Sequence, residues 1–182
     1  MPHINTEPGE HDHTVSAYIV HLDKGEPRIL MHKHKKMGML MCFGGHIEKN
    51  ETPWQSVLHE VPEETGYDIK QLYIMQPVNR LAHMRGAITH PVGIYHATFT
   101  YNPLPGHSHT DTGYLFVTRE DPNGKPAEGE VADNVWMTED EVLALEPDIE
   151  TFANVIDVTS YIFELLRAGE WEKIPAEDIE VF

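Results

Sequence analysis

The sequence predicts a single α/β domain, with one mixed sheet and helices on both of its faces. Three observations support this fold class. Segments rich in β-forming residues lie on both sides of an amphipathic helical pattern at residues 53–65. A second, longer helical pattern follows the last of these segments, at about residues 149–168. The chain has 182 residues, 40% of them hydrophobic, which is enough to bury one core.

The part of the chain before the internal helix is typical of a polar tail followed by short strands. Residues 1–12 are expected to form a flexible N-terminal tail. Thr14–Leu22 and Arg28–His34 are predicted strands, and the turn sequence between them favours a β-hairpin. Met39–Phe43 is a short apolar run that leads into the pair Gly44-Gly45.

The internal helix carries signals at both ends. Thr52 and Gln55 form a predicted capping box, and Pro53 suits the first helical position. Gly66 can end the helix in a left-handed conformation. The face expected to pack against the sheet carries Trp54, Val57, Leu58 and Val61.

After the internal helix the sequence predicts further strands, then two helices. The strands are Asp68–Gln76, Val92–Tyr101, Tyr114–Thr118 and Val135–Met137, with loops at 102–113 and 120–133. Thr138 and Glu141 form a second capping box, which starts a short helix ending near Glu146. Gly169 ends the C-terminal helix. The domain is therefore expected to span residues 13–168, and residues 169–182 to form an acidic tail.

The net charge and the cysteine content limit the classes of binding partner and the cellular compartment that we expect. With 13 Lys and Arg against 30 Asp and Glu, the net charge of −17 repels nucleic-acid polymers and anionic membranes. Neither a secretory signal nor an apolar run of membrane-spanning length is visible. Cys42 is the only cysteine, so an internal disulfide is excluded, and we expect it to be a small apolar side chain. A cytoplasmic protein with a small-molecule partner is expected.

Three carboxylates share one face of the internal helix, because Glu63 and Glu64 follow Glu60 by three and four residues. They repel one another, whereas hard oxygen ligands so arranged suit Mg²⁺ together with water and substrate phosphates. A solvated acidic face is the simpler interpretation. It requires neither the preceding pair Gly44-Gly45 nor the spaced Glu51. We therefore expect metal-assisted phosphate chemistry.

The stretch Gly45–Tyr67 resembles the Nudix box, G-x5-E-x7-R-E-U-x-E-E-x-G-U, in which U is a bulky apolar residue. The matching positions are Gly45, Glu51, Glu60, Val61, Glu63, Glu64, Gly66 and, as the last U, Tyr67. The match is strongest over residues 38–67, and the order of strands extends it to about 13–168. Two positions depart from the family pattern. His59 stands in place of Arg, and Pro62 lies inside the helix, where it removes the hydrogen bond to the Leu58 carbonyl.

The resemblance implies a Nudix-like α/β/α sandwich, with the box as a loop–helix–loop motif, and hydrolysis of a nucleoside diphosphate linked to another moiety. By position, the implied ligands of Mg²⁺ or Mn²⁺ are the Gly45 carbonyl, Glu60, Glu63 and Glu64, and the three glutamates are also the implied catalytic residues. Glu51 would support the site by pairing with His59. The implied general base is Glu60 or a loop acid: Asp111, Glu120 or Glu139. A homodimer is compatible with the resemblance and with the apolar C-terminal helix.

Two polar segments outside the box are candidate substrate-binding regions. His107, His109 and Asp111 resemble the H-x-D-x-x-Y segment of many bacterial Nudix domains, although a connecting loop would also explain them. The second segment is the basic run at residues 32–36. Strand alternation lets only one set face the cleft, either Lys33 and Lys35 or the alternate residues of the run, and Lys33 and Lys35 are our candidates.

Two other functional classes are compatible with the sequence. The departures at His59 and Pro62 favour a catalytically weak or inactive Nudix-fold module that binds a nucleotide or sugar-nucleotide. A structural interaction domain would bind neither metal nor ligand. A zinc hydrolase is disfavoured, because the run that begins at His59 lacks the second histidine of H-E-x-x-H. Three H-x-H pairs nevertheless occur, namely His11/His13, His32/His34 and His107/His109.

Overall fold

The computed structural model describes residues 9–100, 106–130 and 133–181. Its strands are β1 (His11–His21), β2 (Arg28–Lys33), β3 (Leu40–Met41), β4 (Phe43–His46), β5 (Tyr73–Pro77), β6 (Tyr95–Thr100), β7 (Ser108–Thr118), β8 (Asn134–Met137) and β9 (Trp171–Pro175). Its helices are α1 (Pro53–Thr65), α2 (Glu139–Leu143) and α3 (Ala153–Ala168), with short 3-10 turns η1 (Ile69–Gln71) and η2 (Ala176–Asp178).

The strands form one mixed sheet with the order β3-β2-β1-β7-β5-β9. β1 and β7 lie parallel and side by side along their full lengths of 11 residues each. The other strand pairs are antiparallel, and they include β1 with β2, which confirms the predicted hairpin. β4, β6 and β8 pair with β1, β7 and β2, respectively.

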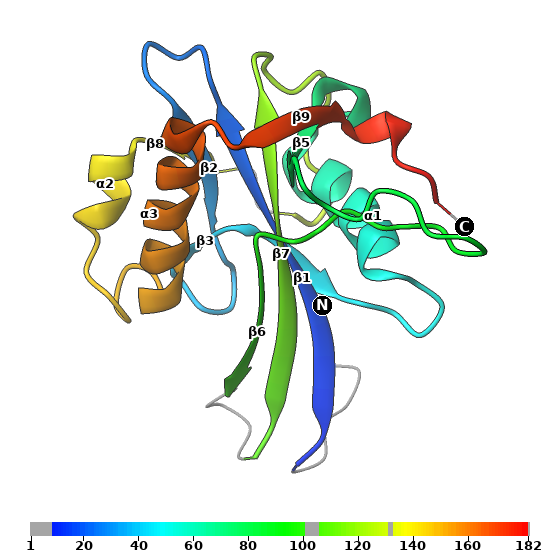
Figure 1. Ribbon diagram of the computed structural model, residues 1–182. Coiled ribbons are helices and arrows are strands. Elements are labelled where there is room, and N and C mark those ends of the chain that lie inside the picture. Colours follow the sequence, from blue (N-terminus) through cyan, green and yellow to red (C-terminus); the bar gives the residue numbers. More distant parts are fainter. Residues whose placement is uncertain (1–8, 101–105, 131–132, 182) are drawn as a thin grey trace.

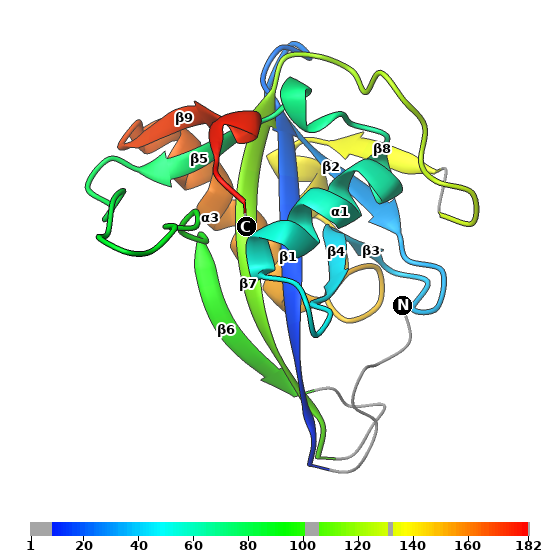
Figure 2. The ribbon, with the colours of Figure 1, turned by 90° about the vertical axis from the view of Figure 1, so that its right-hand side faces the viewer.

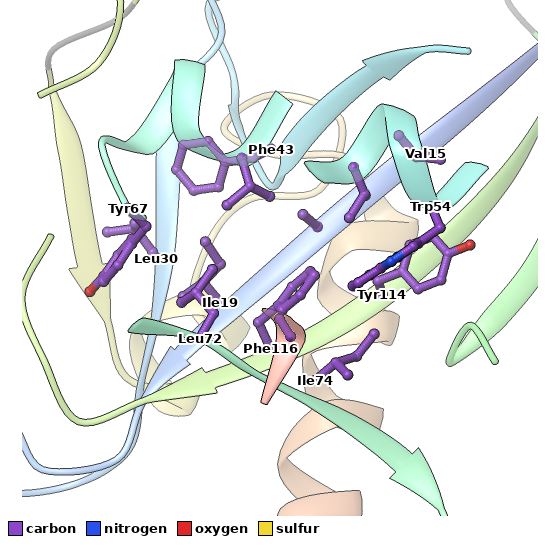
Figure 3. Close-up of a cluster of buried hydrophobic side chains, with 14 residues drawn as sticks. Val15, Ile19, Leu30, Phe43, Trp54, Tyr67, Leu72, Ile74, Tyr114 and Phe116 are labelled. Carbon is purple, nitrogen blue, oxygen red and sulfur yellow. The ribbon is translucent and has the colours of Figure 1, made fainter. Parts of the chain in front are cut away.

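Helices cover both faces of this sheet, as the predicted α/β/α sandwich requires. α1 lies on one face of β1 and β7, and α3 lies on the opposite face with α2 beside it (Figures 1 and 2). One apolar cluster fills the space on the α1 side, where the Trp54 and Phe116 rings stack with centroids 6.0 Å apart (Figure 3). A second cluster, which includes Ile162 of α3, fills the other side. Burial of these two faces is the main driving force for the fold.

The predicted signals at both ends of α1 are confirmed. The Thr52 hydroxyl accepts from the Gln55 N–H, and the Gln55 side chain accepts from the Thr52 N–H, which completes the capping box. Gly66 ends the helix with φ of 77°, and its N–H donates to the Pro62 carbonyl. Pro62 lies inside α1, and the helix continues across it to Thr65. Trp54 of the predicted apolar face is fully buried.

Two strands begin earlier than the sequence predicts. β1 starts at His11, so the predicted tail at 1–12 overlaps the strand by two residues; residues 1–8 of that tail lie outside the described residues. β7 starts at Ser108, inside the predicted loop at 102–113. Both errors have one cause. The polar ends of β1 and β7 pair with each other, and a single-sequence pattern does not contain that partner.

The C-terminal region also differs from the prediction. α2 ends at Leu143 and α3 begins at Ala153, whereas the predictions place these boundaries near 146 and 149. The predicted acidic tail contains β9, which pairs with β5 from Trp171 to Pro175. Gly169 closes α3 as predicted, with φ of 69°. Within the described ranges no helix has both the length and the apolar character needed to cross a membrane.

Candidate active site

Two of the predicted carboxylates, Glu60 and Glu64, are withdrawn from water on the face of α1 near β4. Glu60 is 5% exposed, and its Oε1 accepts no hydrogen bond from any described residue. Glu64 Oε2 accepts from the Gly44 N–H at 2.8 Å, which ties α1 to the first residue of the glycine pair. The i, i+4 spacing of Glu60 and Glu64 therefore places two poorly solvated carboxylates on one face of α1, and Glu64 joins that face to the Gly44 backbone.

The surroundings of Glu60 and Glu64 disfavour their negatively charged forms, so a nearby cation would stabilise these carboxylates. Burial raises the pKa of Glu60 to about 7; the charge of His59 opposes this shift, and the negative charges of Glu63 and Glu130 act in the same direction as burial. Burial also raises the pKa of Glu64 to about 8, although the Gly44 N–H opposes the shift. A divalent cation beside them would favour the ionised forms and would satisfy the bare Glu60 oxygen. The residues present therefore fit a hard, oxygen-liganded ion such as Mg²⁺.

His59 links the other two box carboxylates, although it replaces the arginine of the family pattern. Its Nε2 lies 3.1 Å from Glu63 Oε1, and its Nδ1 lies 3.4 Å from Glu51 Oε1. Partial burial lowers the pKa of His59, but the charges of Glu63, Glu60 and Glu51 together raise it above its usual value. His59 thus makes the contact to Glu51 that the sequence led us to expect, and adds one to Glu63.

A cavity of about 410 Å³ lies on the α3 side of the sheet and reaches the glycine pair. Gly44 connects the cavity with the carboxylates of α1, since it lines the cavity and donates its N–H to Glu64. Its φ is +135°, and a Cβ there would lie 2.0 Å from the Val15 carbonyl oxygen, so only glycine fits without distortion. Gly45, the predicted carbonyl ligand, is the next residue of β4 and also lines the cavity.

The basic run faces the cavity with the other set of its residues. His32, His34 and Lys36 line the cavity, whereas Lys33 and Lys35 are exposed and do not. The expectation that Lys33 and Lys35 form the set that faces the cleft is therefore not met for this cavity. The reason is that burial of β2 extends to His32, which packs against Phe43 with ring centroids 4.8 Å apart, whereas Lys33 at the end of the strand is exposed. Burial lowers the pKa of His32 to about 4.

The second polar segment forms part of β7 rather than a loop. Asp111 and His109 line the cavity, while His107 is fully buried just before the strand. The Asp111 carboxylate accepts two short hydrogen bonds, from Thr14 Oγ1 and from the Tyr95 hydroxyl, each 2.6 Å long. Sequence reasoning missed Tyr95, which reaches Asp111 only because β6 pairs with β7.

The candidate loop acids differ in their positions. Glu120 accepts from Gln71, and Glu139 pairs with Arg167 on α3; neither lines the cavity. Glu130, which sequence reasoning missed, lies close enough that its charge raises the pKa of both Glu60 and Glu64. Its loop is attached to α1, because the Ala127 N–H donates to the Glu63 carbonyl. A loop of this length has no sequence signal that would reveal such an attachment.

Cys42 lies between β3 and β4, where it is 9% exposed. Burial raises the pKa of its thiol to about 12, so the reactive thiolate is almost absent at neutral pH. This agrees with its interpretation as a small apolar side chain and not a nucleophile.

Comparisons with known proteins identify the family. The model of the NUDIX domain family matches residues 12–157. A structure described as a hydrolase of the NUDIX family from Clostridium perfringens is 25% identical, with a TM-score of 0.69 over 86% of this chain and 99% of that one. A C. elegans Ap4A hydrolase in a binary complex is 15% identical, with a TM-score of 0.61 over 85% and 98%. The E. coli dihydroneopterin triphosphate pyrophosphohydrolase is 14% identical, with a TM-score of 0.58 over 85% and 97%.

These matches cover the segment that carries the box and the strands on both sides of it. The two structures under 25% identity support the fold, while the family model and the 25% identical hydrolase support the family itself. The fold, the Glu60–Glu64 pair beside the glycines and the family match agree with one another. The chain therefore belongs to the Nudix family and is a Nudix-type pyrophosphohydrolase.

Proposed function

We propose that the protein hydrolyses a diphosphate bond in a nucleoside diphosphate linked to another moiety, in a reaction that depends on Mg²⁺ or Mn²⁺. The observation that carries the proposal is the Glu60–Glu64 pair. One buried oxygen of Glu60 lacks a hydrogen-bond partner among the described residues, and both carboxyl groups have raised pKa values. Two such groups are unfavourable for stability alone, and they match the ligand needs of a divalent ion.

The residues that would hold the ion are the Gly45 carbonyl, Glu60, Glu63 and Glu64. When bound, a divalent ion neutralises phosphate oxygens and lowers the pKa of a coordinated water. Glu64 is held in place by the Gly44 N–H, and Glu63 by His59. Glu60 is the proposed general base, because it lies on the carboxylate face of α1 and one of its oxygens accepts no hydrogen bond from any described residue. Glu130 is the nearest loop acid to consider beside it.

The cavity is the proposed site for the rest of the substrate. Lys36 and His34 supply cationic or hydrogen-bonding groups at its wall, and Tyr95 and Phe99 supply aromatic surface. Both kinds of contact suit a small phosphorylated molecule that carries a ring system. A cytoplasmic location remains a prediction from the cysteine content and the polar N-terminal residues. A homodimer remains a prediction from the family resemblance and the apolar C-terminal helix.

The test is turnover of a panel of nucleoside triphosphates and compounds linked to nucleoside diphosphates, with Mg²⁺ or Mn²⁺ and with EDTA controls. Glu60→Gln and Glu64→Gln are run beside the wild type, and circular dichroism checks their folding. Turnover that requires the metal and is lost in both variants supports the proposal. If no panel member is turned over but one of them raises the thermal midpoint, the Nudix-fold binding module replaces it.

A further inference from the structure

A second group of metal-ligating side chains lies away from the box carboxylates. Asp12, His107 and His109 each offer one ligand atom, and these atoms lie within 4.8 Å of one another. His107 Nε2 is 3.0 Å from His109 Nε2 and 3.4 Å from Asp12 Oδ2. Asp12 and His107 are 2% and 0% exposed, so the group is built into the fold.

The parallel pairing of β1 and β7 creates this group. Asp12 and His109 are direct partners in the register, and His107 immediately precedes β7. His46, the last residue of β4, pairs with Thr14, two residues along β1 from Asp12. Side chains two residues apart on a strand share a face, so Asp12 lies on the same side of the sheet as Thr14 and the cavity. In Figure 1, these ends of β1 and β7 project beyond the helices.

His46 is positioned to complete the group. Its Nε2 lies 3.5 Å from Asp12 Oδ2, and its ring meets the His109 ring edge to face with centroids 5.1 Å apart. The contacts therefore run from His109 to His107, to Asp12 and to His46, over 3.0, 3.4 and 3.5 Å. Ligands of a tetrahedral ion with bonds near 2.0–2.1 Å are separated by roughly 3.3 Å. These three distances lie close to that separation, and the ligand atoms of Asp12, His107 and His109 all lie within 4.8 Å of one another.

The donor chemistry differs from that of the box. Imidazole nitrogens with one carboxylate suit Zn²⁺ and similar transition metals, whereas Mg²⁺ prefers oxygen ligands. A chain of hydrogen bonds alone could also join these groups. It would bring three imidazoles and a carboxylate together from three separate segments, at a considerable cost in desolvation, to make contacts that simpler side chains could replace.

We propose that Asp12, His107 and His109 bind a Zn²⁺ ion or a similar transition metal, with His46 as the fourth ligand, at a site distinct from the box carboxylates. The ion would fasten the ends of β1, β4 and β7 together. His46 and His109 line the cavity, so the ion would also fix the cavity wall beside Gly45. The proposal does not depend on the reaction proposed above, because binding can be measured without turnover.

The experiment begins with the full chain stripped of metal and then saturated with Mg²⁺. Zn²⁺ is added, and bound zinc is measured by elemental analysis together with the thermal midpoint. Co²⁺ is used as a second probe, because a tetrahedral Co²⁺ site absorbs visible light much more strongly than an octahedral one. The expected result is one tightly bound Zn²⁺ per chain, a raised thermal midpoint and a strong Co²⁺ spectrum.

Variants assign the site. Asp12→Asn and His109→Gln should each weaken Zn²⁺ binding at least about 100-fold, since even groups that only orient a metal ligand contribute 10–100-fold. Glu60→Gln with Glu64→Gln should leave Zn²⁺ binding intact. The matched control is His13→Gln, which removes an exposed histidine from the neighbouring H-x-H pair. Circular dichroism confirms that each variant is folded before binding is measured.

Three outcomes would overturn the proposal. One is a wild type that binds no Zn²⁺ while Mg²⁺ is present. The second is loss of binding in the Glu60 and Glu64 variants, which would place the ion in the box. The third is loss of binding in His13→Gln with full binding in His109→Gln, which would assign the ion to the exposed histidine pair.

Discussion

The carboxylate group of α1 and the histidine group at the ends of β1 and β7 lie near the two ends of the four-residue strand β4. Gly44 donates to Glu64 near one end, and His46 contacts Asp12 at the other. The first group presents oxygen atoms from successive turns of one helix. The second presents mostly nitrogen atoms from three segments far apart in the sequence. The two proposed sites show how one small domain can bind two different cations. Oxygen ligands favour a hard ion such as Mg²⁺, and imidazole nitrogens favour a transition metal.

The two groups also depend on different parts of the fold. The helix group needs only the continuity of α1 and its attachment to Gly44. The histidine group needs the register of β1 against β7, in which Asp12 faces His109. A perturbation that acts on one element should therefore affect one group and spare the other.

Gly44→Ala should have the largest effect, because β4 joins both groups. A Cβ at this position would meet the Val15 carbonyl oxygen at 2.0 Å, on a backbone with φ of +135°. We expect a loss of about 3 kcal/mol or more in the free energy of unfolding, measured by urea denaturation. Gly25→Ala is the control, since its φ is +84° and nothing lies within 4 Å of its Cβ. Equal losses in the two variants would contradict the close approach at Gly44.

Glu64→Gln should separate the two groups cleanly. Metal-dependent turnover should fall at least about 100-fold, because loss of a metal ligand should exceed the 10–100-fold effect of an outer residue. The amide still accepts from the Gly44 N–H, so the fold should survive. Steady-state kinetics measure turnover, and Zn²⁺ titration measures the other group. A parallel loss of Zn²⁺ affinity would show that the groups are not independent.

The imidazole of His32 lines the cavity, and the native fold favours its neutral form. Its pKa is lowered from 6.5 to about 4 by burial and by His34, so between those pH values the unfolded chain binds a proton that the native chain does not. This lowers stability as pH falls through that window. His32→Gln should therefore lose less stability on acidification, by about 1.4 kcal/mol per pH unit.

The measurement for His32 is the free energy of unfolding at several pH values between 6.5 and 4. The exposed His96→Gln serves as the control for removal of an imidazole. Identical pH profiles for the wild type and His32→Gln would refute the buried neutral form.

His59 should give the smallest effect. His59→Arg keeps a cation beside Glu51 and Glu63, so turnover should be maintained or raised. His59→Ala removes both contacts and should lower turnover roughly 10-fold, as for other residues that orient a metal ligand. Kinetics at saturating Mg²⁺ provide the comparison. Complete inactivation by His59→Arg would contradict a supporting role.

The same contrast explains which features the sequence can reveal. α1 was predicted with its ends, because Thr52, Gln55 and Gly66 act within one or two turns of chain. The Glu60–Glu64 spacing is equally local. His59 and Glu51 were paired through the family pattern, and the structure brings them together.

The features that sequence reasoning missed depend on distant partners. β9 forms because β5 lies beside it, and the first residues of β7 are extended because β1 pairs with them. Which residues of the run 32–36 face the cavity depends on how β2 pairs with its neighbours. The alternating sequence alone is compatible with either set. Asp12 and His109 are 97 residues apart in the chain, and Glu130 reaches α1 through a long loop, so neither contact has a local signal.

The reactivity of the buried Cys42 thiol can report how often the structure around it opens. With a pKa raised from 9.0 to about 12, the native thiol forms roughly a thousandth of the thiolate that an ordinary cysteine would. Alkylating reagents should therefore modify the protein chiefly through molecules in which the β3–β4 region has transiently opened. Pulsed alkylation followed by mass spectrometry would count those molecules, even in mixtures and without any substitution in the chain.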